Sequence, residues 1–282
     1  MKYYHVDVFT SEPLAGNGLT VVFPSADIEP EMMLMITQEF KQFETIFIFP
    51  KKNGCFPVRI FTVDEELDFA GHPILGAAAV IHHLQKDNLK EVNINIAAGA
   101  RLISLSSKKN NIWYSVTMNQ GQPVFLRTPD EDEYTDIITA LNLTIDDLYP
   151  GYPLEVVSTG LPYLLIPVKD ALAKVKFNIT DIEPLLETVG AKFAYLFDPG
   201  TLECRSWDNA GLVEDVATGS AAGPLCAYLV KNGYKSSGEK IFLHQGRFVN
   251  RDSIITGWVD EHSGDVMIEG DVALFGFGEL AL

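Results

Sequence analysis

The sequence predicts a mixed α/β (α+β) protein with two similar domains, each made of strands wrapped around one buried helix. The length of 282 residues suits about two domains, because a domain has roughly 150 residues. Two helical segments, 72–84 and 220–232, are apolar nearly all round, which indicates burial on every side. β-rich runs precede and follow both segments.

The two apolar helices end a pattern that occurs twice. Its order is an arginine, an aromatic residue, an acidic residue, a glycine with a polar neighbour, and the helix. The stretch from Arg59 to Gly71 is nearly as long as the stretch from Arg205 to Gly219. Such similarity indicates an internal duplication, with chance resemblance as the alternative. A polar stretch after residue 127 separates the halves, so we expect domains at 1–127 and 128–270.

The remaining elements follow from side-chain periodicity and from turn residues. Alternation of apolar and polar residues at the N-terminus predicts a first strand, and a turn rich in Pro, Gly and Asn follows it. Pro30 and a Met/Leu/Ile stripe predict a helix over 30–42. Further strands are expected at 19–23, 44–49, 58–62, within 91–127, at 154–158, 163–168, 193–198 and 202–207, and in the C-terminal tail, with short helices near 170–175 and 181–189.

Composition and charge exclude several classes of protein. The chain has 21 Lys and Arg against 38 Asp and Glu, a formal net charge of −17. Such a chain repels phosphate backbones and anionic membranes, so we expect neither nucleic acid nor a membrane as partner. No uncharged apolar run reaches the ~18 residues of a membrane span. Three scattered cysteines form neither a disulfide framework nor a metal motif, and a cytoplasmic location is expected.

The starts of the two apolar helices are candidate anion sites. Gly71-His72 and Gly219-Ser220 each place a glycine where the first helical turn leaves N–H groups unpaired. A substrate carboxylate suits such a position, because the helix dipole adds partial positive charge. The alternative is structural, with Ser220 as a simple N-cap and His72 as a packed core residue.

Two acidic residues are candidates for proton transfer. Glu44 lies between aromatic residues at the start of a strand, where loss of water would favour general acid–base work. Asp215 precedes the second apolar helix and could be a second acid–base group or orient the first. An exposed edge acid or ion-pair partner at Glu44, and a turn cap at Asp215, are the alternatives.

Other polar residues favour structural roles. Asn17 lies in a Gly-Asn-Gly turn, and Arg59 and Arg205 suit internal ion pairs. His82-His83 ends a helix and lacks further ligands at metal-site spacing, so no metal is expected. The sequence contains no GxGxxG after a strand, no Walker A loop, no HExxH and no GxSxG. Nucleotide-binding, zinc-protease and serine-hydrolase functions therefore lose support.

Segments along the whole chain resemble the phenazine biosynthesis-like (PhzF-like) family of the diaminopimelate epimerase fold superfamily. They are VDVFTSEPLAGNGLTVV, FETIF, RIFTVDEELDFAGHPILGAA, STGLPYLLIPV, VEDVATGSAAGPLCAYL and HQGRFVNR. The resemblance implies two domains, each a β-barrel-like sheet around a central helix, with residues 271–282 returning to the first domain. It also implies an active site in the interdomain cleft, no metal or organic cofactor, and a homodimer.

The resemblance also implies the chemistry. Epimerases of the superfamily use two cysteines, but Ala70 and Val216 occupy those positions here. Phenazine-type isomerases use instead the glutamate that matches Glu44 as general acid–base. The resemblance makes His72 and Asp215 its catalytic partners.

Carboxylate binding is implied for Gly71, Gly219 and Ser220. The family often has Ser where Phe43 stands and Pro where Val216 stands, which leaves the substrate open. We therefore expect a cofactor-independent isomerase that moves a proton between carbons of a small carboxylic acid. A small-carboxylate binding or regulatory protein without turnover, or a thiol-independent epimerase, is the alternative.

Overall fold

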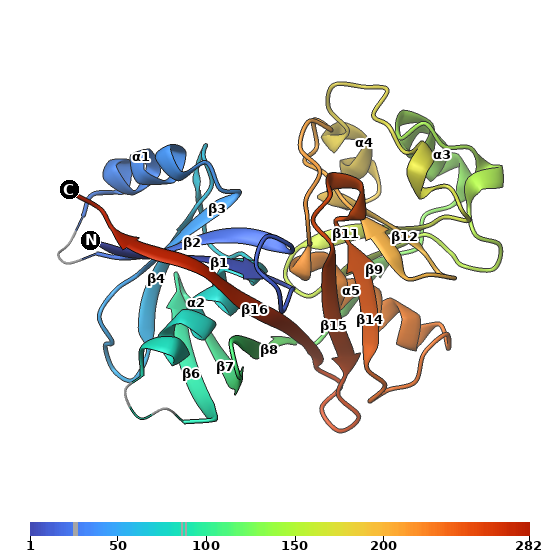
Figure 1. Ribbon diagram of the computed structural model, residues 1–282. Helices are drawn as coiled ribbons and strands as arrows, with labels where there is room; N and C mark the ends of the chain where they lie inside the picture. Colours follow the sequence, from blue (N-terminus) through green and yellow to red (C-terminus); the bar gives the residue numbers. More distant parts are fainter. Residues whose placement is uncertain (25–27, 86, 88) are drawn as a thin grey trace. The chain divides into compact units, whose positions relative to one another are not determined.

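The computed structural model describes residues 1–24, 28–85, 87 and 89–282 (Figure 1). The chain divides into two compact units, which we describe one at a time. The first comprises Met1–Asn119, Arg251–Ile254 and Glu269–Leu282, and the second comprises Gln120–Asn250 and Ile255–Ile268. The limits expected from the sequence are 127 and 270.

Among the described residues of the first unit, eight strands close into a barrel. Their order is β1, β2, β3, β4, β6, β7, β8 and β16, and β16 pairs back with β1. The elements are β1 (Lys2–Val8), β2 (Asn17–Phe23), α1 (Pro30–Phe40), β3 (Glu44–Ile48), β4 (Phe56–Phe61), β5 (Glu66–Leu67), α2 (Gly71–Leu84), β6 (Glu91–Ala98), β7 (Arg101–Asn110), β8 (Trp113–Gly121) and β16 (Val266–Glu279).

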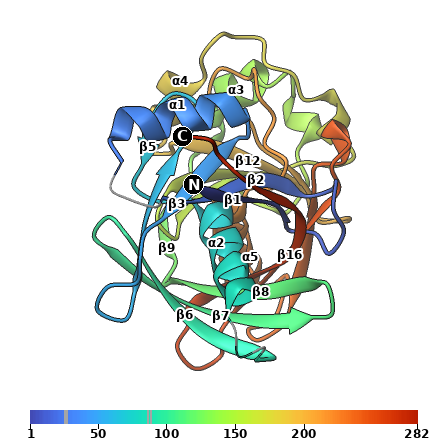
Figure 2. The same cartoon turned by 60° about the vertical axis from the view of Figure 1, so that its left-hand side comes forward.

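Helix α2 fills the barrel. Figure 2 shows it running between β1 and β2 on one side and β6 to β8 on the other, and it contacts β1, β2, β3, β6 and β7. Every residue from Gly71 to His82 is buried. Gly76 allows the close approach, since a Cβ there would lie 2.4 Å from Leu19 Cδ2. The prediction of a fully buried helix is confirmed, and the helix begins one residue before 72.

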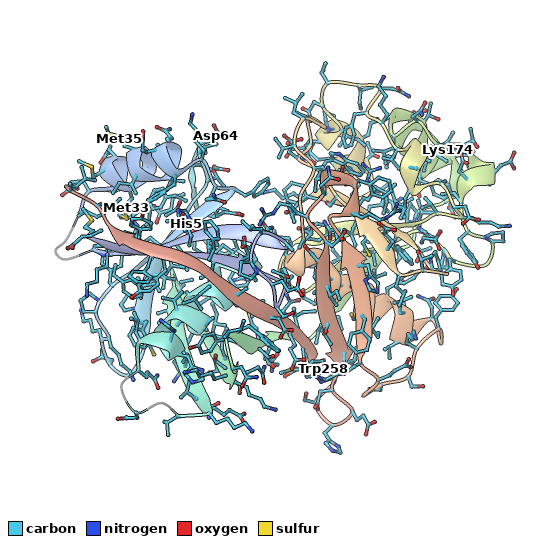
Figure 3. All side chains as sticks on the ribbon, in the orientation of Figure 1. His5, Met33, Met35, Asp64, Lys174 and Trp258 are labelled. Atoms are coloured by element: carbon cyan, nitrogen blue, oxygen red, sulfur yellow. The ribbon has the colours of Figure 1, made fainter. Side chains whose placement is uncertain are left out.

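Helix α1 covers the outside of the barrel. Met33 is fully buried against β2, β3 and β4 side chains, whereas Met35 is 62% exposed (Figure 3). Pro30 lies in the first turn, as the sequence predicts. The helix stops at Phe40 because Lys41 adopts a left-handed conformation, so it is shorter than the predicted 30–42.

The second unit has the same kind of architecture. Its sheet order is β16, β15, β14, β13, β12, β11, β10 and β9. The elements are β9 (Val124–Arg127), α3 (Glu131–Ala140), β10 (Glu155–Ser158), β11 (Pro162–Pro167), α4 (Glu183–Thr188), β12 (Phe193–Asp198), β13 (Glu203–Arg205), α5 (Gly219–Lys231), β14 (Ile241–Gln245) and β15 (Ser253–Val259), with 3-10 turns η1 (Ile145–Asp147), η2 (Leu172–Lys174) and η3 (Arg247–Val249).

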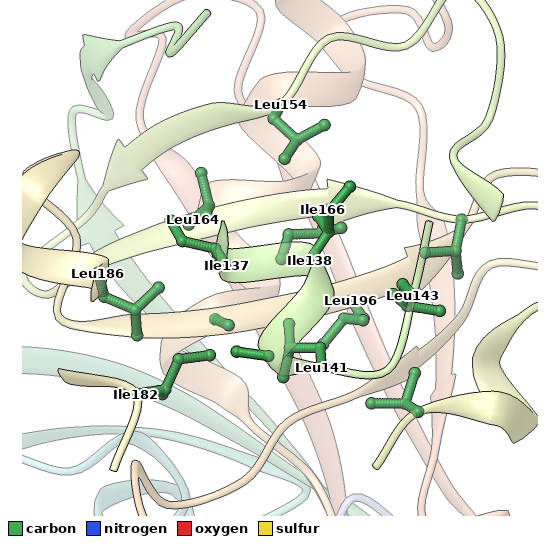
Figure 4. Packing of buried hydrophobic residues seen from close by; sticks show 14 of the residues in the cluster. Ile137, Ile138, Leu141, Leu143, Leu154, Leu164, Ile166, Ile182, Leu186 and Leu196 are labelled. Carbon is green, nitrogen blue, oxygen red and sulfur yellow. The ribbon is translucent and has the colours of Figure 1, made fainter. Parts of the chain in front are cut away.

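Two layers of apolar side chains form the core of this unit. Helix α5 is buried from Ala221 to Leu229 and contacts β10 and β11. Helices α3 and α4 cover the face of the sheet opposite to α5. Leucine and isoleucine side chains from both helices pack there against those of β11 and β12 (Figure 4). The second apolar helix of the prediction is therefore also a central helix.

Strand pairing repeats between the two units. The successive pairs β1–β2, β2–β3, β3–β4 and β4–β6 are antiparallel, parallel, antiparallel and parallel. The pairs β10–β11, β11–β12, β12–β13 and β13–β14 follow the same order. The central helix enters after β4 and its short partner β5 in one unit and after β13 in the other. This agreement supports the internal duplication that the sequence pattern indicates.

The arginines of the repeated pattern make equivalent contacts. Arg59 binds both carboxylate oxygens of Glu66, and Arg205 binds both of Glu214. Each guanidinium also lies over the aromatic ring two positions later, at 5.3 Å in β4 and 4.3 Å after β13. The structural role expected for both arginines is confirmed. Strand β13 stops at Arg205, earlier than the predicted 207, because Trp207 forms only an isolated bridge with Glu214.

No helix within the described residues is long and apolar enough to cross a membrane.

Candidate active site

Glu44 opens β3 inside the first unit. Parallel pairing with β2 places it level with Leu19, and the residue is only 6% exposed. The strand is buried along its whole length. A carboxyl group at such a position loses most of its water, which is costly unless a polar partner is present. The exposed-edge alternative for Glu44 is therefore wrong.

One such partner is His72, the second residue of α2. His72 Nε2 lies 3.2 Å from Glu44 Oε2, and the two side chains are 7% and 8% exposed. Burial lowers the pKa of His72 to about 3, so the imidazole is neutral near pH 7. The contact is therefore not a pair of opposite charges. The two atoms are close enough for a hydrogen bond but do not form one in this arrangement.

The start of α2 leaves backbone donors available beside this pair. No side-chain cap bonds to the helix start, and the N–H groups of Gly71 and His72 meet no backbone acceptor among the described residues. Pro73 has no N–H to offer. We call Glu44, Gly71 and His72 the first cluster. It combines a buried acid with the positive end of a helix dipole.

The start of α5 has the same form in the second unit. Gly219 begins the helix without a side-chain cap, and Ser220 Oγ lies 2.7 Å from the hydroxyl of Tyr163 on β11. The capping role for Ser220 is therefore not observed. Its hydroxyl and the adjacent N–H groups line the first turn, as an anion site requires.

Asp215 lies on the turn that leads into α5. Its carboxylate accepts hydrogen bonds from the Thr218 hydroxyl at 2.7 Å and from the Ala217 N–H at 3.3 Å. These contacts fit the turn-capping alternative, and they also hold the carboxylate in one orientation at the helix start. Asp215, Gly219 and Ser220 form the second cluster.

Three residues around the clusters were not predicted from the sequence. Tyr163 binds Ser220, Gln245 on β14 binds the turn at Asp215 and Thr218, and Gln120 donates to the Gly219 carbonyl at 3.0 Å. Tyr163 and Gln245 have a signal in the sequence, since they belong to the STGLPYLLIPV and HQGRFVNR segments of the family resemblance. Gln120 has none.

The Asn17 turn is held by the last arginine of HQGRFVNR. Arg251 donates to the carbonyls of Ala15 and Gly16 and to the Asp7 carboxylate, at 2.6 to 2.8 Å. Asn17 follows as the first residue of β2 and is 1% exposed. The turn predicted from Gly-Asn-Gly is present, and its asparagine faces the interior.

The histidines at the end of α2 have structural partners. His82 contacts the Ser107 hydroxyl and the Leu89 carbonyl, each at 2.9 Å, and His83 contacts the Tyr114 hydroxyl at 3.1 Å. Within residues 1–24, 28–85, 87 and 89–282, no group of His, Cys, Asp and Glu is arranged to hold a metal ion.

Comparison with known proteins decides the family. The model of the phenazine biosynthesis-like protein family (PhzC-PhzF) matches residues 6–276. The chain belongs to this family. It is 32% identical to the uncharacterized isomerase YddE of Escherichia coli K12, with 100% of this chain and 98% of that protein covered.

Two further relatives define the kind of PhzF-like protein. The trans-2,3-dihydro-3-hydroxyanthranilate isomerase of Pseudomonas fluorescens is 28% identical over 100% of this chain and 99% of its own. The structure of a predicted epimerase from Pseudomonas aeruginosa matches with a TM-score of 0.93 and 43% identity, covering 100% and 99% of the two chains. The expected fold and family are confirmed, and the protein is an isomerase of the PhzF type.

Proposed function

We propose that this PhzF-like isomerase moves a proton between two carbons of a small carboxylic acid, with Glu44 as the general acid–base. The observation that carries the proposal is the buried contact of 3.2 Å between Glu44 Oε2 and His72 Nε2. A group that first takes and then returns a proton must exist in both protonation states at the working pH. Exclusion of water favours the uncharged form of a carboxyl group, which serves the second half of that task.

His72 supports this cycle as a neutral partner. Because burial lowers its pKa to about 3, it does not hold Glu44 permanently as a carboxylate, as a protonated imidazole would. A neutral ring can donate to the carboxylate from an N–H or accept from the carboxylic acid at Nε2. Glu44 therefore has a hydrogen-bonding partner within reach in both of its states.

The helix starts supply the groups that bind the substrate carboxylate. Gly71, Gly219 and Ser220 offer backbone N–H groups, and Ser220 adds a hydroxyl. Each helix dipole favours an anion at the N-terminus of its own helix. We propose that Asp215 orients the substrate. The predicted cleft between the domains, the absence of a cofactor, the homodimer and the cytoplasmic location stay predictions.

The decisive experiment replaces Glu44 with glutamine. Glu44→Gln keeps the shape of the side chain but cannot carry the proton, so turnover should fall by about 10² to 10⁴-fold. The exposed Glu65→Gln is the matched control. The first compound to test is trans-2,3-dihydro-3-hydroxyanthranilate, for which the Pseudomonas relatives are named. Full activity of Glu44→Gln would reject the mechanism.

Solvent deuterium separates the proposal from its alternatives. A panel of unsaturated and hydroxylated carboxylic acids is incubated with the protein in D2O and analysed by mass spectrometry and NMR. Migration of a double bond with deuterium incorporation supports the isomerase. Binding without exchange would indicate a binding protein, and inversion at one carbon would indicate a thiol-independent epimerase.

A further inference from the structure

The amide side chain of Gln245 is buried and forms hydrogen bonds to the turn that carries Asp215. Gln245, at the end of β14, is 2% exposed. Its Nε2 donates to the Asp215 carbonyl at 2.9 Å and to Thr218 Oγ1 at 3.0 Å. Its Oε1 accepts from the Thr218 N–H and from the Tyr195 hydroxyl, both at 3.1 Å. All hydrogen-bonding positions of the amide are therefore satisfied inside the protein.

The backbone fixes which way this amide faces. The Thr218 N–H can only donate, so it requires the amide oxygen of Gln245. The Asp215 carbonyl can only accept, so it requires the amide nitrogen. An amide with its oxygen and nitrogen exchanged would bring donor against donor and acceptor against acceptor. The position of the two amide atoms thus follows from the main chain and not from other side chains.

The amide then determines the direction of a hydroxyl proton. Because Gln245 Nε2 donates to Thr218 Oγ1, that hydroxyl accepts on the side of the glutamine. Its single proton is left for another acceptor, and Asp215 Oδ2 lies 2.7 Å away. A donor at that distance makes a strong hydrogen bond to the carboxylate and holds its plane.

We propose that Gln245 is a positioning residue of the active site, which directs the Thr218 hydroxyl toward Asp215 and so presents Asp215 as a fixed hydrogen-bond acceptor. Its meaning for catalysis rests on the proposed function of the second cluster. The two acids then have different tasks: Glu44 carries the proton, and Asp215 orients what is bound.

Comparison of the two duplicated units indicates that the fold does not require the hydrogen bonds of Gln245. In the parallel pair β4–β6, the residue before Arg59 pairs with Ala98. In the parallel pair β13–β14, the register of Glu203 with His244 brings Gln245 level with the residue before Arg205. The first unit therefore has an alanine where the second unit has the amide. The hydrogen bonds of Gln245 thus occur only in the unit that carries Asp215, among the two positions compared.

The test compares substitutions that remove or keep single hydrogen bonds. Thr218→Val removes the hydroxyl at nearly constant volume, Thr218→Ser keeps it, and Gln245→Met removes the amide. The ¹³Cγ resonance of Asp215 near pH 7, assigned by comparison with Asp215→Asn, reports the hydrogen bonding of the carboxylate. It should move in Thr218→Val and Gln245→Met and stay in Thr218→Ser.

A matched control uses the second amide at the start of α5. Gln120 donates to the Gly219 carbonyl and accepts from Thr159, and neither contact involves Asp215. Gln120→Met should therefore leave the Asp215 resonance in place. An equal displacement in Gln120→Met and Gln245→Met would overturn the proposal, because it would reflect general disturbance of the helix start.

Turnover provides the second readout, on the acid that the deuterium panel identifies. Loss of a hydrogen bond to a charged group lowers kcat/KM by about 10-fold or more. Gln245→Met and Thr218→Val should each show this loss, and the double variant no more than the larger of the two, since both break one chain of contacts. Additive losses would refute the inference.

The two proposals can fail separately. If Gln245→Met does not fold, the contrast between Thr218→Val and Thr218→Ser still decides, and an unmoved resonance in Thr218→Val refutes the positioning role. Full activity of Glu44→Gln rejects the proposed mechanism without touching the resonance shifts.

Discussion

The two arginines of the duplication provide a test of how burial changes the contribution of an ion pair. Arg205 and Glu214 have side chains 9% and 10% exposed, whereas Arg59 and Glu66 are 31% and 39% exposed. Arg205 also donates to the Leu172 carbonyl at 2.6 Å. Its guanidinium lies near two aromatic rings, at 4.3 and 3.9 Å. The same substitution, Arg to Met, can be made at both sites.

The expected costs differ several-fold. Removing one partner of a buried ion pair leaves a buried carboxylate uncompensated and costs about 3–5 kcal/mol. Removing one partner of an exposed pair costs about 1 kcal/mol or less. At roughly 2–4 °C per kcal/mol for a chain of this class, Arg205→Met should lower Tm by about 10 °C and Arg59→Met by at most about 4 °C.

Thermal and urea unfolding followed by tryptophan fluorescence measure both variants under one set of conditions. Trp207 lies beside Arg205 and reports the second unit directly. Equal destabilisation of the two variants, or a larger loss in Arg59→Met, would refute the reasoning. The double variant Arg205→Met, Glu214→Leu tests the mechanism further, since it removes the stranded carboxylate and should recover part of the loss.

Three more predictions concern single groups. Burial holds the pKa of His72 near 3 in the folded protein. As pH falls below about 6.5, His72 therefore takes up a proton in the unfolded chain but not in the folded protein. The free energy of unfolding should therefore decrease between about pH 6.5 and about pH 3, and His72→Gln should reduce that slope in urea titrations. Gly16→Ala should destabilise by about 1–3 kcal/mol, because φ is +64° and the new Cβ would lie 2.4 Å from a backbone oxygen; an unchanged urea midpoint would contradict this. A thiol reagent should modify Cys55 rapidly in the native protein and the other two only on unfolding, because burial raises the thiol pKa of Cys204 to about 12 and that of Cys226 further.

The elements that the sequence predicts well are those whose signal is local. Both central helices lack a polar face, and both begin within one residue of the expected position. Helix ends are predicted less accurately, as at Lys41, where a left-handed residue stops α1. Nothing in the side chain of a lysine predicts that conformation, which favours glycine and asparagine.

The site could be predicted by residue type but not by contact. Glu44 and His72 lie far apart in the sequence, and their approach depends on the β2–β3 pairing and on the depth of α2 in the barrel. The hydrogen bonds of Gln245 depend on a strand that begins well after the turn it holds. Long-range pairing of this kind leaves no periodic mark in the sequence, so only the family resemblance points to that segment.

The last strand of the first barrel has a consequence for how the chain is made. Lys2 pairs with Glu279, and the main chains of Met1 and Leu280 bond to each other. During synthesis β1 therefore leaves the ribosome long before its partner β16 has been made. One edge of the growing sheet stays unpaired until the last strand is complete. Such an edge is slow to close and prone to association. A fragment that ends at Asn119 would lack β16 and keep the unpaired edge of β1. We therefore do not expect this fragment to fold stably by itself.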